Sequence, residues 1–205
     1  ITHVVRGCEY LSSTPKYNLL YEAFGWEIPT YIHLPLIMGK DADGNVSKLS
    51  KRHGATGFYD LINEGYLPQA IINYIALLGW CNQEIFTLAE LEKEFDVSGI
   101  SKSPSIFDYD KLSWFNGEYL KAMTPEEFTN VCMPYYKKVF GDREMPFEKF
   151  AEILQKRTTK LTDIPEMLGF FAELPEYDKE LFVNKKSKTN LENAPVVLRE
   201  AYERL

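Results

Sequence analysis

The stretch Val46-Ser47-Lys48-Leu49-Ser50-Lys51-Arg52-His53-Gly54 is the most informative part of this 205-residue chain. It holds three fixed positive charges and a hydroxyl within five residues, with glycines on both sides. A mobile loop of this composition can close over a polyanion, because lysine supplies a point charge and arginine a fork of donors for phosphate oxygens. Charge alone favours a solvated surface loop, since short basic runs are common. A phosphate-binding role for this loop, about residues 38–57, therefore depends on evidence from the neighbouring sequence.

The residues before this loop have the pattern of an α/β unit. A short alternating strand at 3–6 leads to Ser12-Ser13-Thr14-Pro15, where a hydroxyl cap and a proline predict a helix running to about Phe24. Residues 31–37 have the composition of a second strand. Strand, helix and strand form half of an α/β unit with no earlier strand to pair with, and we expect the chain to be cut at its start.

From Phe58 onward the pattern is helical. Pro68 opens an apolar run that Gly79 closes, and its near-continuous hydrophobicity predicts a buried helix. Capping boxes at 87–90 and 124–127 mark two more helix starts. Other helices are expected at about 110–121, 147–157, 164–172 and 191–205. The sequence thus predicts a mostly α protein with a small α/β part.

Composition limits the class of protein. With 45% hydrophobic and 26% charged residues, the chain should be globular. No apolar run is long enough for a membrane span and no targeting pattern is visible, so we expect a cytoplasmic protein without a membrane partner. Cys8, Cys81 and Cys132 are far apart and odd in number, which predicts ordinary thiols and no bound metal.

A net charge of −7 argues against a nucleic-acid partner, but the charge is unevenly spread. Residues 82–99 and 163–180 sum to −4 and −5, whereas residues 137–160 hold seven basic residues against four acids, a sum of +3. A local basic surface is compatible with this distribution, and so is a solvated helical face of mixed charge. The candidates for phosphate contact in the basic stretch are Lys137, Lys138, Lys156 and Arg157.

The segment Lys48-Leu49-Ser50-Lys51-Arg52 resembles the Lys-Met-Ser-Lys-Ser signature of class I aminoacyl-tRNA synthetases, in the Lys-Leu-Ser-Lys-Arg-His-Gly form of bacterial glutamyl enzymes. Other segments look like the same family in the same order: Thr2 to Lys16, His33 to Ile37, Gly65 to Trp80, and Ser103 to Leu112 with Trp114, Asn116 and Tyr119. The resemblance covers about residues 1–140 strongly and the rest weakly. The family's His-Ile-Gly-His type motif is absent.

The resemblance implies a glutamate–tRNA ligase, which joins glutamate to ATP and then moves the glutamyl group to the terminal ribose of tRNA(Glu). Residues 1–50 would be the remnant of its Rossmann-type catalytic domain, 51–123 a helical stem-contact region, and 124–205 the first part of a helical-bundle anticodon-binding region. ATP, with Mg²⁺, and glutamate are the expected substrates, tRNA(Glu) is the expected partner, and no DNA is expected. We expect a monomer, and a 205-residue chain inactive by itself.

The resemblance also assigns the candidate catalytic residues. Lys51 would contact the ATP phosphates and stabilise charge as pyrophosphate departs, with Lys48 and Arg52 assisting. Ser50 would shape the loop through hydrogen bonds to its own backbone. Arg6, at the end of a strand where open α/β sheets bind ligands, would hold the glutamate carboxylate by two parallel bonds.

Three further residues would bind ATP: Glu9, Tyr10 and Ile37, the last through its backbone. Cys8 falls where many relatives carry an acidic residue. The histidines at 3, 33 and 53 are expected to be structural. Four aromatic residues can stack on bases, although at helical spacing they are more often core: Phe107, Trp114, Phe115 and Tyr119.

Several alternatives stay open. Glutaminyl-tRNA synthetase shares the lysine loop, but the wording of the signature and the helical second half argue against it. A shortened relative that glutamylates a modified tRNA base lacks an anticodon-binding region, which residues 124–205 would supply. A helical RNA-binding module without catalysis is the alternative from another class of protein. An upstream His-x-Gly-His type segment in the parent gene would separate enzyme from module.

Overall fold

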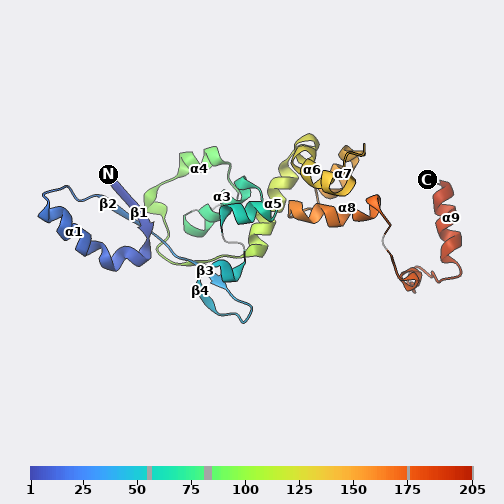
Figure 1. Ribbon diagram of the computed structural model, residues 1–205, viewed down its shortest axis with the longest axis horizontal. Helices are drawn as coiled ribbons and strands as arrows, with labels where there is room; N and C mark the ends of the chain where they lie inside the picture. The colour runs from blue at the N-terminus through green and yellow to red at the C-terminus, as the bar shows by residue number, and fades with distance from the viewer. Residues whose placement is uncertain (55–56, 81–84, 175, 205) are drawn as a thin grey trace. The chain divides into compact units, whose positions relative to one another are not determined.

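A computed structural model describes residues 1–54, 57–80, 85–174 and 176–204, with only the backbone of Arg52 (Figure 1). The chain divides into two compact units, Ile1–Glu166 and Met167–Leu205. Helices dominate, as the sequence predicts, and the last strand is a short one at Ser105–Ile106, within the region that the sequence predicts as helical. No helix in the described part of the chain has the length and apolar character needed to cross a membrane.

The first strands form the predicted α/β unit. Strands β1 (His3–Gly7) and β2 (Thr30–Leu34) pair in parallel, with Val5 opposite Ile32, and α1 (Thr14–Ala23) connects them. A parallel pair requires such a crossover connection. The two predicted strands therefore pair with each other.

The start of α1 is confirmed at Thr14, but the predicted hydroxyl cap is wrong. The 3₁₀ helix η1 (Cys8–Ser13) runs directly into α1, so Ser13 has helical backbone angles. Its hydroxyl donates to the Tyr10 carbonyl at 3.0 Å and does not accept from the first turn of the helix. At the other end, Gly25 has the positive φ of 68° that is common just past a helix.

The predicted strand at 31–37 is wrong in one respect, because it is two strands in different sheets. Strand β2 ends at Leu34, and β3 (Ile37–Lys40) lies between β4 (Val46–Lys48), which is antiparallel to it, and β5 (Ser105–Ile106), which is parallel. Pro35 has no N–H to donate to a ladder, which explains the break.

The lysine loop begins as a β-hairpin. Strands β3 and β4 pair with Met38 opposite Lys48, and Figure 1 shows the hairpin below the helices. The Asp41 carboxylate accepts the N–H groups of Asp43 and Asn45 at 3.0 and 2.8 Å, and Gly44 takes a positive φ of 87°. These are the features that let a short polar segment reverse the chain.

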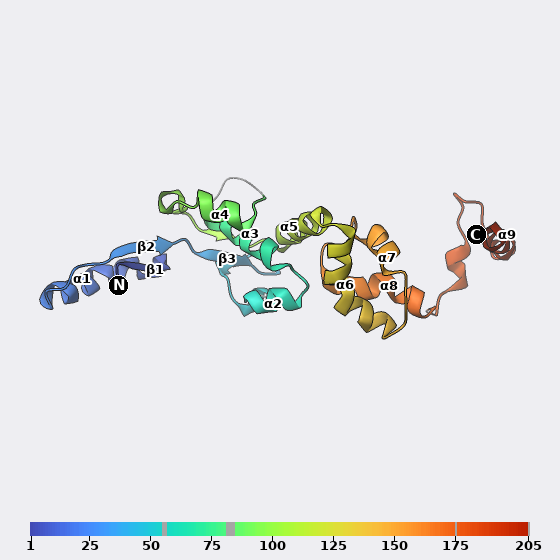
Figure 2. The same ribbon diagram turned by 90° about the horizontal axis from the view of Figure 1, so that it is seen from above.

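The main core of unit 1 lies between α3 (Pro68–Gly79) and α5 (Tyr109–Ala122), with α2 (Phe58–Asn63) beside them. Its buried members are Leu61, Tyr66, Ile71, Tyr74, Phe107, Leu112 and Phe115. Phe107 and Phe115 are therefore core residues, whereas Trp114 is 42% exposed. Figure 2 shows α3 and α5 from a second direction.

The predicted buried helix, α3, is buried on one face, and its opposite face is exposed. Ala70, Ile71 and Tyr74 have no exposed surface, whereas Ile72 and Ile75 are 38% and 43% exposed. The buried positions lie three and four residues apart and form a single helical face.

The remaining helices fall close to their predicted places: α4 (Leu88–Glu94), α6 (Pro125–Phe140), α7 (Phe147–Leu154), α8 (Ile164–Ala172) and α9 (Ala194–Arg204). Both capping boxes are confirmed. Thr87 N–H donates to the Glu90 carboxylate at 2.7 Å, and Glu90 N–H donates back to the Thr87 hydroxyl at 3.3 Å. The second box has the same reciprocal bonds, at 2.8 and 3.2 Å.

Helices α6 and α7 pack through stacked aromatic rings. The Phe140 and Phe150 rings are 5.4 Å apart at an angle of 11°, and those of Tyr136 and Phe147 are 5.1 Å apart at 8°. Helix α7 ends three residues earlier than predicted, in a turn in which Arg157 N–H donates to the Leu154 carbonyl.

Unit 2 contains the 3₁₀ helix η5 (Lys179–Phe182), a bridge between Asn184 and Thr189, and α9. Both bridge hydrogen bonds are 3.1 Å long. Helix α9 begins three residues later than predicted because Asn193 caps it: its carbonyl accepts the Val196 and Val197 amides. Its predicted last residue, 205, lies outside the described residues.

Candidate active site

Arg6 lies near the carboxyl end of β1, where parallel strands present ligand-binding residues. Its Nη2 donates to the Thr14 hydroxyl at 2.7 Å, and its Nε donates to His33 Nε2 at 3.5 Å. Thr14 is the first residue of α1 and His33 belongs to β2. Both strands and the helix of the α/β unit therefore meet at this guanidinium.

Three tyrosine rings also surround the Arg6 guanidinium. Its central carbon lies 5.3 Å from the ring centre of Tyr10, 5.1 Å from that of Tyr17 and 4.9 Å from that of Tyr31. Each ring attracts a cation through the negative charge of its face. These contacts restrict the orientations of the guanidinium.

The lysine loop and η1 meet through an ion pair. Lys48 Nζ lies 2.8 Å from Glu9 Oε1, and both side chains are solvent-accessible, at 66% and 41%. The hydrogen bond from Lys48 lowers the pKa of Glu9, and the same bond raises the pKa of Lys48. The Glu9 carboxylate folds back over Gly7, where an added Cβ would lie 2.0 Å from it. Two segments 39 residues apart are brought together here.

His53 organises the second half of the loop. Its Nδ1 accepts the Ser50 backbone N–H at 3.0 Å and lies 3.2 Å from the Ser50 hydroxyl, while its Nε2 lies 3.2 Å from the Ser47 hydroxyl. The Ser50 carbonyl also lies 3.1 Å from Nδ1, so the ring is held against the backbone of Ser50 on one side and the Ser47 hydroxyl on the other. A Cβ added at Gly39 would come within 2.6 Å of the ring, so this glycine makes room for it. The histidine has a structural role in this loop.

Lys51 begins the 3₁₀ turn η2 (Lys51–His53) and is exposed. The side chain of Arg52 lies outside the described residues, so its predicted role has no structural counterpart here. Leu49, between the two lysines of the signature, packs against the main core, and its N–H donates to the Ile37 carbonyl at 2.9 Å. The loop is thus anchored by its apolar residue, while Lys48 and Lys51 remain exposed.

The thiols and metal-binding residue types are not gathered into a site in the part of the chain that the structure describes. Cys8 and Cys132 are free, and Cys81 lies outside the described residues. Burial raises the pKa of the Cys132 thiol to about 12, so this cysteine stays protonated at neutral pH. Among the described residues, no group of three or more His, Cys, Asp or Glu is placed to hold a metal ion.

The structure does not bring the four basic tRNA candidates together. Lys137 and Lys138 lie in the last turn of α6, roughly 18 Å from its first residue at 1.5 Å per residue. Lys156 and Arg157 follow Gln155, whose side-chain amide is 2.6 Å from the Met123 carbonyl, just before α6 begins. The two basic pairs therefore lie at opposite ends of the α6–α7 pair.

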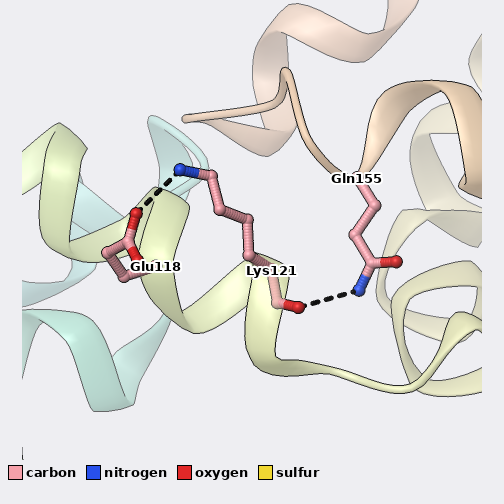
Figure 3. Close-up of polar contacts among 3 residues, drawn as sticks. All are labelled: Glu118, Lys121 and Gln155. Atoms are coloured by element: carbon pink, nitrogen blue, oxygen red, sulfur yellow. Dashed lines mark hydrogen bonds and ion pairs between the residues drawn. The ribbon is translucent and has the colours of Figure 1, made fainter.

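Figure 3 shows the end that carries Gln155. Its amide also reaches the carbonyls of Leu120 and Lys121, at 3.0 and 3.4 Å, and so satisfies the last carbonyls of α5. The Lys121 side chain turns the other way and pairs with Glu118 at 2.7 Å. Lys121 is a further cation at this end, which the sequence argument missed because it lies outside the basic stretch 137–160.

The residues around Arg6 are not predictable from local sequence patterns. The sequence indicates only a helix start at Thr14 and gives no role to Tyr17 or Tyr31. The available signal was the concentration of tyrosines on either side of the first helix, at 10, 17, 21 and 31. That signal indicates a cluster only once β1 and β2 are known to pair.

A parallel α/β unit with an arginine at a strand end, joined to a lysine signature loop and followed by helices, is the arrangement of a class I synthetase. Residues 1–114 match the family of class I tRNA synthetases (E and Q), catalytic domain, and the chain belongs to this family. Residues 115–205 match the anticodon binding domain. The resemblance inferred from the lysine signature is confirmed.

Several similar proteins are glutamate–tRNA ligases. The glutamate–tRNA ligase of Clostridium novyi (strain NT) is 55% identical over 207 residues, 98% of this chain and 42% of the relative. That of Clostridium kluyveri is 56% identical, over 98% of this chain and 41% of the relative. The crystal structure of the Elizabethkingia meningosepticum glutamate tRNA ligase with its amino acid has a TM-score of 0.79 at 34% identity, over 99% of this chain and 43% of that one. The chain thus spans about 42% of the length of the first of these relatives.

Proposed function

We propose that the full-length protein is a glutamate–tRNA ligase. The observation that carries this proposal is the contact between Lys48 and Glu9, which joins the lysine signature loop to the segment that follows Arg6. A phosphate-binding loop and a carboxylate-binding arginine are then neighbours in one site, as a reaction between an amino acid and ATP requires. The names of the relatives support the same choice.

The proposed reaction has two steps. A glutamate carboxylate oxygen attacks the α-phosphorus of ATP, forming glutamyl-adenylate as pyrophosphate leaves. A hydroxyl of the terminal ribose of tRNA(Glu) then attacks the glutamyl carbonyl, and AMP leaves. Both steps depend on positioning and on stabilising negative charge, which suits fixed cations better than a protein acid or base.

We assign the residues of this chain to the first step. Arg6 holds a carboxylate of glutamate, and Lys51 contacts the phosphates as charge builds up on the departing pyrophosphate. Lys48 assists by exchanging Glu9 for a phosphate oxygen, and its exposed ion pair is of the weak kind that a polyanion can displace. Glu9 is then free to contact ATP.

Other assignments rest on the family. Tyr10 and the backbone of Ile37 would contact the adenosine, and Arg52 would assist at the phosphates. Mg²⁺ usually binds phosphate oxygens and water with one or two carboxylates, and we propose that it enters with ATP, with no residue of this chain assigned to it. We also propose that residues 1–50 belong to the catalytic part, residues 51–123 to a stem-contact part, and residues from 124 onward to an anticodon-binding part.

The test is aminoacylation by the full-length protein with purified tRNA(Glu) and tRNA(Gln), each with glutamate and with glutamine. We expect glutamate to be attached to tRNA(Glu) in an ATP-dependent reaction. Because the matching family includes glutamine enzymes, the glutamine arms are informative. Charging of tRNA(Gln) with glutamine alone would replace the proposal by a glutaminyl enzyme, and no charging in any arm would favour an RNA-binding module.

A further inference from the structure

Asn116 is a fully buried polar residue, and its side-chain amide forms hydrogen bonds with backbone groups. Its Oδ1 accepts the Leu67 N–H at 2.7 Å, and its Nδ2 donates to the carbonyls of Gly65 and Thr159 at 3.3 and 2.6 Å. The orientation of the amide is fixed, because a backbone N–H can only donate and a carbonyl can only accept. One side chain of α5 thus binds two segments that lie far from it and from each other in sequence, residues 65–67 and residue 159.

These points belong to a joint formed by the turn 64–67, by Asn116 and by the segment 159–162. The segment has two further bonds to the turn: Leu161 N–H donates to the Gly65 carbonyl at 3.1 Å, and the Thr162 hydroxyl donates to the Glu64 carbonyl at 2.7 Å. A Cβ added at Gly65 would lie 2.6 Å from the Thr162 nitrogen. Any other residue at 65 would push the two segments apart.

The joint lies across the boundary between the two matched domains. The turn 64–67 belongs to the part matched by the catalytic domain, and 159–162 belongs to the part matched by the anticodon binding domain. The turn 64–67 and the segment 159–162 nevertheless fall in one compact unit, which extends to Glu166. Without other contacts, the two matched domains would be connected only through helix α5. After α7 the chain returns to the turn 64–67 and makes a second connection. Asn116 binds both the turn and the returning segment 159–162.

The joint is also adjacent to the lysine loop through the main core. Leu49, within the signature, packs against the cluster that contains Tyr66 and Phe115. Tyr66 lies between the two turn residues that Asn116 binds, and Phe115 directly precedes Asn116. The Tyr66 hydroxyl lies 3.0 Å from the Ser113 hydroxyl of α5, a further polar contact at this point. Close-packed cores transmit displacements because they hold few voids.

We propose that Asn116 is a positioning residue for aminoacylation, which fixes the helical tRNA-binding part relative to the lysine loop. This inference rests on the proposed function. It also gives a role to Asn116, a residue of the family resemblance to which the proposed function assigned no chemistry. Without the joint, tRNA would still bind the helices, but its acceptor end would reach the site in many orientations.

The test uses Asn116→Ala in the full-length protein. We expect kcat for aminoacylation at saturating tRNA to fall about tenfold to a hundredfold, since small misplacements of reacting groups have effects of this size. The dissociation constant for tRNA should stay within about threefold of the wild-type value, because the contact surface is unchanged. Hydrogen exchange should become faster in peptides covering 64–68 and 158–163.

Gln155→Ala is the matched control. It also removes an amide that binds backbone carbonyls, but its partners Leu120, Lys121 and Met123 lie in the same matched domain as Gln155 itself. We expect lower thermal stability with kcat within about twofold of wild type, as for any loss without an effect on positioning. A fall in kcat equal to that of Asn116→Ala would show that destabilisation alone explains both, and would overturn the inference.

A second pair of variants keeps the test valid if Asn116→Ala does not fold. Thr162→Val removes one bond of the joint at nearly constant volume, and Thr162→Ser retains the hydroxyl. Valine should lower kcat severalfold and serine should restore it. If the wild-type protein charges tRNA(Glu) while the valine variant, or a folded Asn116→Ala, keeps its kcat within twofold, this inference alone fails. A wild-type protein inactive on every tRNA would instead overturn the proposed function.

Discussion

At the scale of single residues, the lysine signature combines two kinds of side chain with different tasks. Leu49 holds the loop against the core, while Lys48 and Lys51 remain in contact with solvent. His53 bonds to both serines of the signature region, so the backbone is ordered before any ligand arrives. Preorganised charge of this kind stabilises a transition state without the cost of reorganisation.

We predict that Lys51→Ala in the full-length protein slows adenylate formation by about a hundredfold or more, the effect of losing one preorganised electrostatic donor. Binding of tRNA should be nearly unchanged. Pre-steady-state measurement of adenylate formation gives the rate. The control is Lys40→Ala, an exposed lysine of the same hairpin outside the signature, which should retain the wild-type rate. A Lys51→Ala rate within threefold of wild type would refute the assignment.

A second residue-scale prediction concerns Tyr74, whose hydroxyl accepts the Asp108 N–H at 2.6 Å. Burial raises the pKa of Tyr74 to about 12, from an ordinary value of 10.0. The unfolded chain therefore loses this proton first, so the stability present below pH 10 declines as the pH rises towards 12. At pH 11 the contribution to the free energy of unfolding is a loss of about 1 kcal/mol.

Tyr74→Phe should remove that alkaline loss while lowering stability at pH 7 by about 1–3 kcal/mol, because the Asp108 N–H loses its acceptor. Urea unfolding at pH 7, 9 and 11 measures both effects. Tyr59→Phe, at a position 79% exposed, is the control and should leave both unchanged. An equal decline between pH 9 and 11 in the wild type and in Tyr74→Phe would contradict the assignment.

At the scale of elements, the capping hydrogen bonds that the sequence predicts form where no other contact replaces them. The box at Thr124 forms both of its bonds, with Pro125 in the first turn of α6. The hydroxyl expected to cap α1 does not, because the preceding 3₁₀ turn holds Ser13 in a helical conformation and its carbonyls already accept the Thr14 N–H. Capping signals therefore predict helix starts better than they predict the atoms involved.

We predict that Thr124→Ala lowers the free energy of unfolding by about 1 kcal/mol, the usual cost of losing an N-cap hydroxyl. Thr129→Ala is the control on the same helix. Its hydroxyl donates only to the Pro125 carbonyl four residues back, a bond that adds little to a helix. Chemical denaturation should show a smaller change for Thr129→Ala, and equal changes would mean that the box is not the source of the effect.

At the scale of the whole molecule, the division of basic charge matters more than its total. The net charge is −7, yet Lys137 and Lys138 lie at one end of the α6–α7 pair and Lys156 and Arg157 at the other. A single tRNA backbone running along the pair can reach both ends, whereas a contact with one end leaves the other solvated.

We predict that charge reversal at Lys156 and Arg157 weakens tRNA binding by the full-length protein and lowers the slope of log affinity against log salt, because fewer phosphates are neutralised. Reversal at Lys137 and Lys138 is the matched comparison at the other end. Titration of labelled tRNA at several salt concentrations gives both slopes. Slopes unchanged in both variants would show that the stretch 137–160 is a solvated face and that tRNA binds elsewhere.

The sequence by itself determined the class of protein, because that conclusion depends on residues close together along the chain. The signature from Lys48 to Arg52 and the order of the flanking motifs indicated a class I synthetase, and the helices were predicted from caps, glycines and periodicity to within a few residues. Such signals are local, and short-range sterics and hydrogen bonds are enough to express them.

Only the tertiary structure decided which distant groups meet. Strands β4 and β5, of three and two residues, are too short to give a pattern. The pairing of Lys48 with Glu9 and the split of the basic stretch depend on how elements pack. The role of Asn116 depends on a turn 49 residues earlier and a segment 43 residues later. A buried amide needs hydrogen-bond partners, and the fold decides which backbone groups lie close enough to serve. Because those groups are far away along the chain, the sequence alone does not identify them.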